Sequence, residues 1–254
     1  MNKIKAVFFD MDGVIIDTEK DGHRVAFNET FRDFGFKVEW SEEKYHELLQ
    51  VAGGKERMRH YLHTEGFGVE IKADEEDELI KELHRRKTAL FVDLIESGKL
   101  PLRSGVKRIM QEVNEAGLFL AICTTSNERS AHTVAYQTLK DVRFDLVLAG
   151  DVVSKKKPDP EIYQLALETA CVRSVEAFVI EDSRNGVLAA HAAGIHVLAT
   201  TNEYTEKEDL SLADLVVTSL GEPDGKKGIL RKSNRDFEFD GVMHLDQLLA
   251  YFSG

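Results

Sequence analysis

The sequence predicts an α/β protein with a Rossmann-like core on a parallel sheet and an all-helical domain inserted into that core. Short apolar runs recur along the chain, and helical patterns separate most of them. Such alternation is typical of a parallel sheet with helices on both faces. One long stretch near the start has only amphipathic helical patterns. The 254 residues also exceed the ~100–200 of a usual domain, so a core and a smaller second module fit this length.

The first expected strand is the apolar run 4–9, which ends abruptly at Asp10 as a buried parallel strand does. Further strands are expected at 118–123, 144–149, 177–180, 195–199 and 215–217. Helices are expected at about 104–116, 127–139, 159–171 and 184–193. After Ser219, a loop rich in Gly and Lys and a terminal helix at 244–252 complete the core, without a functional role.

The helical insert is expected at 17–99, so the core domain comprises 1–16 and 100–254. Many charges and glycine breaks at 35, 53–54 and 66–68 mark this stretch. It leaves the core directly after the first strand. Two short hinges would then hold it above the carboxyl edge of the sheet, where open α/β sheets bind ligands.

Composition limits the possible partners. The net charge of −12 would repel a phosphate backbone, so nucleic acid is not expected. No apolar run approaches the ~18 residues that span a membrane, and the start is too short for a signal peptide, which predicts a cytoplasmic protein without membrane contact. We also expect a monomer. Cys123 and Cys171 lie in apolar contexts without CxxC spacing, which favours buried reduced thiols.

Two carboxylates follow the first strand. Side chains at i and i+2 of an extended segment point the same way, so Asp10 and Asp12 converge. Their repulsion favours a bound cation, and Mg²⁺ prefers carboxylate oxygens, while a nucleophile beside an acid or base would suit catalysis. The alternative is an ordinary turn, because Asp-Gly is a common turn dipeptide.

Three later strand ends carry complementary groups. Hydroxyls and backbone N–H groups at 124–127 suit an anion or a simple helix cap. Lys157, next to a proline-initiated helix, would reach a phosphate or an aspartate, or lie in a solvated lysine run. Glu181 and Asp182 form a second acidic pair that would complete a Mg²⁺ site or cap a helix. Together the four strand ends supply every part that phosphoryl transfer needs.

These motifs resemble those of the haloacid dehalogenase superfamily over residues 4 to about 218. The resemblance implies that Asp10 attacks phosphorus and that Asp12 protonates the leaving group and then activates water. It implies Mg²⁺ bound by Asp10, Asp12 through its carbonyl, and Asp182, with Glu181 supporting them. The remaining implied roles are catalytic ones for Thr124 and Lys157 and phosphate binding by Thr125, Ser126 and Asn127. The dehalogenases lack the second aspartate, so Asp12 argues for phosphate chemistry.

The insert resembles that of β-phosphoglucomutase and, more closely, of the CbbY sugar-bisphosphate phosphatases. That resemblance implies that residues in and beside the insert contact the substrate, namely His23, Gly54, Lys55, Arg57, Lys87 and Arg103. The alternative is a solvated helix face for the residues of the insert and a structural ion pair for Arg103. One extra residue before His23, in an Asp21-Gly22 pair, departs from the usual spacing. His60 and His63 are expected to be surface residues, because a third metal ligand is missing.

The sequence therefore predicts a magnesium-dependent phosphatase of a small sugar phosphate or bisphosphate, for example xylulose 1,5-bisphosphate. The alternative is a sugar phosphomutase with the same core, which must exclude water until a bisphosphate intermediate has turned around. A non-catalytic binding protein on this fold is the third possibility, and intact Asp10 and Asp12 speak against it.

Overall fold

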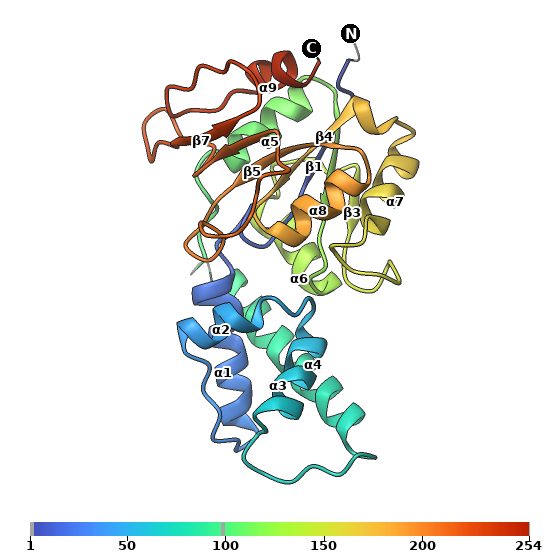
Figure 1. Cartoon of the computed structure of the whole chain (residues 1–254), viewed down its shortest axis with the longest axis vertical. Helices are drawn as coiled ribbons and strands as arrows, with labels where there is room; N and C mark the ends of the chain where they lie inside the picture. The colour runs from blue at the N-terminus through green and yellow to red at the C-terminus, as the bar shows by residue number, and fades with distance from the viewer. Residues whose placement is uncertain (1–2, 98–99, 254) are drawn as a thin grey trace. The chain divides into compact units, whose positions relative to one another are not determined.

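The computed structural model describes residues 3–97 and 100–253, except for the side chains of residues 20 and 21 (Figure 1). The chain divides into two compact units. One comprises Met1–Asp17 with Pro101–Gly254, and the other comprises Thr18–Leu100. Within the described ranges, no helix is both long and apolar enough to cross a membrane.

The first unit is built on one sheet of seven strands in the order β3-β2-β1-β4-β5-β6-β7. The strands are β1 (Ala6–Phe9), β2 (Phe119–Cys123), β3 (Leu146–Leu148), β4 (Ala177–Glu181), β5 (His196–Thr200), β6 (Leu215–Val217) and β7 (Leu230–Ser233). The first six are parallel, which confirms the predicted sheet, and β7 runs antiparallel to β6 at the edge. Sequence analysis missed β7 because Leu230 begins a mostly polar segment without an apolar run.

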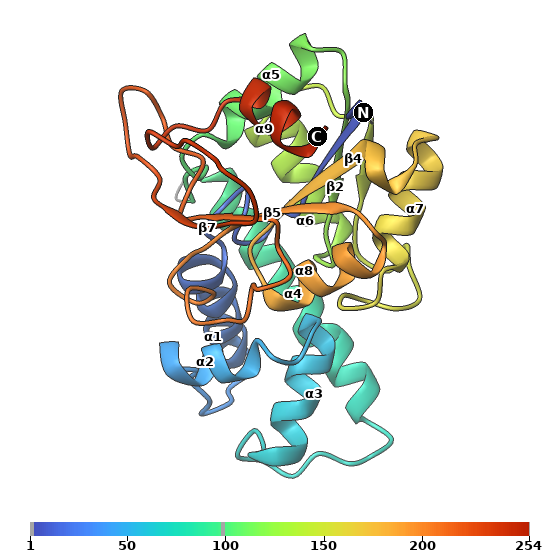
Figure 2. The same cartoon turned by 45° about the horizontal axis from the view of Figure 1, so that its top comes forward.

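Helices cover both faces of this sheet. They are α5 (Val106–Glu115), α6 (Glu128–Thr133), η2 (Val134–Thr138), α7 (Glu161–Ala170), η3 (Ser174–Glu176), α8 (Arg184–Ala192) and α9 (Leu245–Phe252). Side chains of α7 and α8 share one buried cluster with alternate strand residues such as Phe8 and Val179. Phe178 points to the other face and stacks on Phe252 of α9 at 5.0 Å between ring centroids. On that face α9 lies next to α5 (Figure 2).

The second unit consists of helices and their connections, with no strand among its described residues, as expected. Its elements are η1 (Glu19–His23), α1 (Arg24–Asp33), α2 (Glu42–Leu48), α3 (Gly54–Thr64) and α4 (Glu76–Glu96). Its core is aromatic, with Trp40 lying 4.7 Å from Phe27 and 5.0 Å from Phe31 between ring centroids. The side chain of Asn28 binds both backbone groups of Trp40, at 2.8 and 3.0 Å, so the connection before α2 is fixed to α1.

The extra residue before His23 lies in a turn of π-helix. The N–H of His23 donates to the carbonyl of Thr18 at 2.6 Å, and the N–H of Arg24 donates to Glu19. This i to i−5 pattern takes one residue more than an α-helical turn, which suits the one extra residue that the family resemblance implies before His23. His23 is buried as a result, with Nδ1 at 2.8 Å from Lys87 Nζ.

The two cysteines differ in exposure, although both are free thiols. Cys123 is buried at the end of β2, as expected. The expectation for Cys171 is wrong, because its side chain is exposed. Cys171 ends α7 in the left-handed conformation, with φ at 53°. Its side chain is therefore exposed, although its neighbours in the sequence are apolar.

Candidate active site

Asp10 begins the turn that follows the central strand β1. Its backbone N–H donates to the carbonyl of Ile180 at 2.9 Å, which extends the pairing of β1 with β4 by one residue. The side chain is 11% exposed, so a carboxyl group lies almost fully buried at the carboxyl edge of the sheet. Open α/β sheets bind their ligands at this edge.

Lys157 lies against this carboxyl group. Its Nζ is 2.6 Å from Asp10 Oδ1, 2.6 Å from Glu181 Oε1 and 2.9 Å from the carbonyl oxygen of Cys123. Burial would lower the pKa of Lys157, but Asp10 and Glu181 outweigh it and raise that pKa. The lysine therefore stays charged, and it reaches Asp10 at the end of β1, whereas Lys155 and Lys156 pair with the nearby Asp159 and Asp151.

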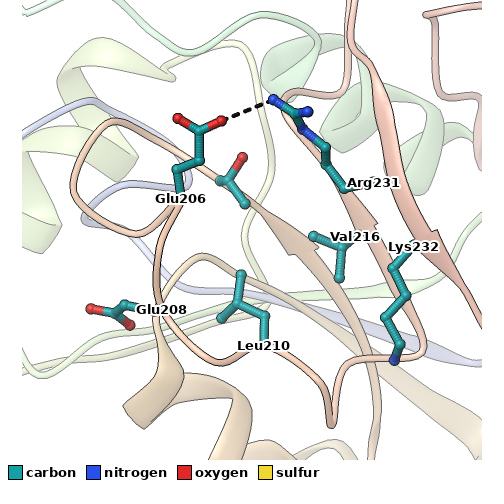
Figure 3. A pocket seen from close by; sticks show the side chains of 7 residues that line it. Glu206, Glu208, Leu210, Val216, Arg231 and Lys232 are labelled. Atoms are coloured by element: carbon teal, nitrogen blue, oxygen red, sulfur yellow. Dashed lines mark hydrogen bonds and ion pairs between the residues drawn. The ribbon is translucent and has the colours of Figure 1, made fainter.

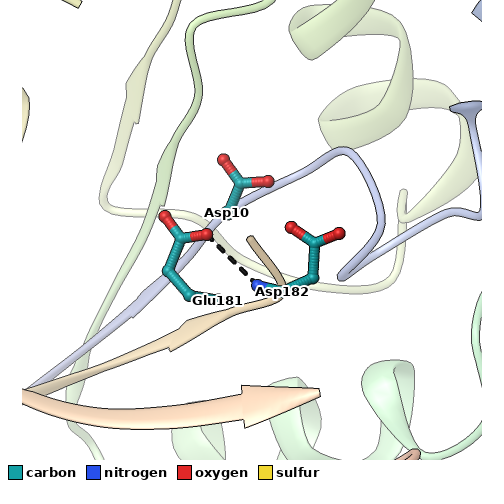
Figure 4. Close-up of side chains that lie close together, drawn as sticks. All are labelled: Asp10, Glu181 and Asp182. Carbon is teal, nitrogen blue, oxygen red and sulfur yellow. Dashed lines mark hydrogen bonds between the residues drawn. The ribbon is translucent and has the colours of Figure 1, made fainter. Parts of the chain in front are cut away.

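Three carboxyl groups from two neighbouring strands meet here: Asp10, Glu181 and Asp182 each offer an oxygen within 4.8 Å of the others (Figure 4). Burial raises the pKa of Asp10 well above its usual range; Lys157 opposes this effect, and Glu181 and Asp12 add to it. One lysine does not balance this much buried negative charge. A hard divalent cation would, and carboxylate oxygens are its preferred ligands, so the residues present fit a magnesium ion.

Glu181 is fixed by the groups around it. It accepts a hydrogen bond from the Tyr163 hydroxyl, and its Oε2 accepts one from the Asp182 N–H at 3.2 Å. A Cβ on Gly186 would lie 2.0 Å from Glu181 Cδ, so only glycine fits there on α8. The roles of Tyr163 and Gly186 could not be predicted from the sequence. Tyr163 lies six residues after Lys157, and only the fold brings its hydroxyl to Glu181.

The segment after β2 contributes hydroxyl groups. Thr124 is buried, and its Oγ1 accepts a hydrogen bond from the Ser126 N–H at 3.0 Å. The Ser126 hydroxyl in turn donates to Asp12 Oδ2, which links this segment to the turn after β1. Asn127 Oδ1 accepts from the Arg129 N–H at 2.9 Å and so caps α6. The helix cap that the sequence left open is therefore present, at Asn127.

Arg103 is surrounded by backbone acceptors. Its guanidinium donates to the carbonyl of Gly13, to Thr200 Oγ1 at 3.1 Å, and to the carbonyls of Thr201 and Thr218 at 2.6 and 3.0 Å. These contacts join the turn after β1 to the ends of β5 and β6. Both terminal nitrogens therefore bind parts of the protein itself, while a substrate contact of Arg103 stays a prediction.

The helical unit places two of the expected basic residues in its interior. Arg57 is 8% exposed; its Nε donates to the carbonyl of Leu48 at 3.0 Å, and its Nη1 donates to the Tyr45 hydroxyl at 3.1 Å. Lys87 is also buried, and its Nζ lies 4.8 Å from the centroid of the Phe27 ring.

The other expected residues of this unit are closer to its surface. Gly54 begins α3 and Lys55 follows it, half-buried. His60 and His63 are exposed, as expected for surface residues, and His63 pairs with Glu76 at 2.9 Å.

Two further features of the described residues, a buried thiol and a cavity, do not match this chemistry. Burial raises the pKa of the Cys123 thiol to about 12, so it stays protonated and weakly nucleophilic. A separate cavity of about 300 Å³ lies beside β6 and β7 (Figure 3). Its charged groups are already paired: Arg231 binds Glu206 at 2.9 Å, and Lys232 donates to two backbone carbonyls.

Comparison with known proteins agrees with this geometry. The model of the haloacid dehalogenase-like hydrolase family matches residues 7–200, which include the carboxyl ends of β1 to β5. A CBBY-like protein of Arabidopsis thaliana is 44% identical over 222 residues, which cover 86% of this chain and 70% of the relative. A phosphorylated carbohydrates phosphatase of Thermotoga maritima is 32% identical over 192 residues, covering 76% and 82%.

A solved structure is similar along most of its length. It is a mutant CbbY from Rhodobacter sphaeroides in complex with xylulose-(1,5)bisphosphate. Its TM-score is 0.78 at 36% sequence identity, and the match covers 87% of this chain and 97% of that one.

Proposed function

Because the chain belongs to the haloacid dehalogenase-like hydrolase family and is a phosphatase, we propose that it hydrolyses a small sugar phosphate or bisphosphate in the cytoplasm, with Asp10 as nucleophile and Mg²⁺ as cofactor. The observation that carries this proposal is the buried Asp10 carboxylate with Lys157 Nζ at 2.6 Å and two further carboxylates within 4.8 Å. No other described group combines a nucleophile with a counter-charge and metal ligands in this way.

In the proposed reaction, an Asp10 oxygen attacks the phosphorus atom and an aspartyl phosphate forms. Asp12 donates a proton to the leaving sugar oxygen and then takes a proton from the water that hydrolyses the aspartyl phosphate. The hydrogen bond from the Ser126 hydroxyl to Asp12 Oδ2 supports this role, since it orients the carboxyl group of the acid.

The magnesium ion would be held by Asp10, by the backbone carbonyl of Asp12 and by Asp182. Bound there, it would offset negative charge and polarise a phosphoryl oxygen. Glu181 would support this group rather than carry out a step, because it already accepts from Lys157, Tyr163 and the Asp182 N–H.

The phosphoryl group would be bound by this chain's own donors. We expect the Thr124 hydroxyl and the Thr125 N–H to bind its oxygens, with Ser126 and Asn127 beside them. Lys157 would neutralise charge on both Asp10 and the transferring group. We assign Arg103 a positioning role, since its four bonds hold the Gly13 turn and two strand ends.

The specific substrate that we propose is a ketopentose bisphosphate such as xylulose 1,5-bisphosphate. The similarity to CbbY supports this choice. Lys55 and Arg57 would bind the distal phosphate, and His23, Gly54 and Lys87 would contact the sugar. Arg57 also ties α3 to the preceding segment through Leu48 and Tyr45, so its loss would affect stability as well as binding.

The test is phosphate release from a panel of sugar mono- and bisphosphates, with Mg²⁺ and with EDTA. We expect fast, metal-dependent release from xylulose 1,5-bisphosphate. Conversion of β-glucose 1-phosphate to glucose 6-phosphate without free phosphate would instead establish the phosphomutase and overturn the phosphatase.

The distal phosphate site is tested with Lys55→Ala. We expect a roughly tenfold or larger rise in KM for the bisphosphate and little change for a monophosphate, because one charge-assisted contact is lost. Lys81→Ala is the matched control, since Lys81 is an exposed lysine on α4 of the same unit. Equal effects of both variants, or of Lys55→Ala on both substrates, would exclude a distal phosphate contact by Lys55.

A further inference from the structure

The loop that follows β5 reaches the carboxylate cluster through one amide side chain that sequence analysis did not single out. Asn202 Nδ2 donates a hydrogen bond to Asp182 Oδ2 at 2.6 Å. Asp182 follows β4 and Asn202 follows β5, and these strands are neighbours in the sheet. The contact therefore joins two adjacent strand ends at the proposed metal site.

The orientation of the Asn202 amide is fixed from its other end. Its Oδ1 accepts hydrogen bonds from the N–H groups of Tyr204 and Thr205 at 2.9 and 3.0 Å. Two backbone donors on one side require the amide oxygen there, so the NH₂ group must face Asp182. The Asn202 N–H also donates to Thr205 Oγ1 at 3.1 Å, which closes the loop on itself.

Gly13, in the turn after β1, lies directly against this hydrogen bond. A Cβ on Gly13 would lie 2.0 Å from Asp182 Oδ2 and 2.7 Å from Asn202 Nδ2, and the φ of Gly13 is +78°. Arg103 binds the carbonyls of Gly13 and Thr201, the residue before Asn202. The same guanidinium thus ties both the turn and the loop, which leaves the Asp182 carboxylate little freedom to turn away.

We propose that Asn202 is a positioning residue that holds Asp182 in the orientation needed to bind Mg²⁺, an inference that rests on the metal site of the proposed function. A carboxylate has two oxygens and several acceptor sites, so a hydrogen bond to Oδ2 is compatible with metal ligation. Partners that orient a ligand commonly contribute tenfold to a hundredfold to metal affinity. Asn202 does not contact the reacting atoms, so its effect belongs to metal binding rather than to the chemical step.

The test compares Mg²⁺ affinity, measured by calorimetry on the substrate-free full chain, among the parent, Asn202→Ser and Thr205→Val. A serine retains a hydroxyl that caps the loop but is too short to reach Asp182. Thr205→Val removes the hydroxyl that binds the Asn202 N–H and leaves the amide in place. We expect roughly a tenfold or greater loss of affinity in Asn202→Ser and less than about a threefold loss in Thr205→Val. At saturating Mg²⁺, kcat of Asn202→Ser should stay within about threefold of the parent, because the metal-loaded site is the same.

Two results would overturn the inference while leaving the metal site intact. One is parent-like Mg²⁺ affinity in Asn202→Ser, and the other is an equal loss in Thr205→Val, which would trace the effect to the loop fold. A parent protein that binds no Mg²⁺ would overturn the proposed metal site itself, and this inference with it.

Discussion

Asp10 is in an environment that suits catalysis better than stability. Burial raises its pKa, and two nearby carboxylates add to this effect, so the folded protein opposes the ionised form that a nucleophile requires. Lys157 and a bound cation would act in the opposite direction. Strained or destabilised groups of this kind concentrate at functional sites.

One consequence concerns Asp10→Asn in EDTA. A folded-state pKa above the unfolded value of about 4 means that the free energy of unfolding falls as pH rises between these two values. The asparagine variant lacks this loss, so we expect it to have a higher Tm than the parent at pH 8, with the difference shrinking toward pH 5. Thermal unfolding at both pH values measures this, with the exposed-loop variant Asp224→Asn as the control. A lower Tm than the parent at pH 8 would contradict the assignment.

The strand-end residues of this site could be predicted from the sequence, whereas their partners could not. Asp10, Lys157 and Glu181 each follow or adjoin a recognisable strand or helix, and their residue types suit phosphoryl transfer. Tyr163 and Asn202 look like an ordinary helix residue and an ordinary loop residue. Their roles depend on hydrogen bonds to segments 18 and 20 residues away, which no local pattern encodes.

At the scale of elements, the close packing of α8 on the end of β4 is the feature that fixes Glu181. Gly186→Ala would place a methyl group 2.0 Å from Glu181 Cδ, so the carboxylate bound to Lys157 must move. We expect phosphate release to fall about a hundredfold, the effect of a displacement near 1 Å in a catalytic group.

Gly117→Ala provides the control for Gly186→Ala. Gly117 also belongs to the core unit, has φ at +66°, and has no atom within 4 Å of an added Cβ. Its substitution should cost about 1–2 kcal/mol of stability through backbone strain and leave turnover unchanged. Similar turnover in Gly186→Ala and the parent would show that Glu181 can move without consequence.

The β5–β6 pair depends on Asp214 in a pH-dependent way. Burial alone would raise the pKa of Asp214, but hydrogen bonds from His196 and the Val197 N–H outweigh it and lower that pKa. This stabilisation is present above the unfolded pKa and is lost as pH falls through the folded one. Asp214→Asn should therefore lower Tm by about 3 °C at pH 7 and by less at pH 3. Equal losses at both pH values would assign the effect to packing.

The sequence predicted the six parallel strands because each is an apolar run of a length typical of buried strands. The edge strand β7 was not predicted, because Arg231 and Lys232 in its middle are typical of a surface loop. The π-turn at 19–23 also could not be foreseen. An extra residue shifts the spacing, but only the backbone hydrogen bonds reveal how the helix absorbs it.

At the scale of the whole molecule, the interruption of an α/β pattern by a helical stretch predicted two modules from the sequence alone. The structure divides the chain into two units, after Asp17 and after Leu100. The sequence predicted which strand ends lie together at one edge of the core sheet. It did not predict which polar side chains contact each other there, because hydrophobic periodicity carries no information on such contacts.

Binding of Mg²⁺ to the folded protein should stabilise the molecule as a whole. A ligand at a hundred times its Kd contributes about 2.7 kcal/mol, which corresponds to several degrees in Tm for a chain of this size. We expect such a rise in the parent and its near absence in Asp182→Asn, measured by thermal unfolding over a range of Mg²⁺ concentrations. An equal rise in both proteins would place the bound ion elsewhere.

The most direct test of the account is to trap the phosphoryl group on the protein. The parent is mixed with labelled xylulose 1,5-bisphosphate and Mg²⁺, quenched in acid within one turnover, and digested for peptide mapping. We expect phosphate on the peptide that contains Asp10, and none in Asp10→Asn. Turnover without protein-bound phosphate, or phosphate on a different residue, would contradict Asp10 as the nucleophile.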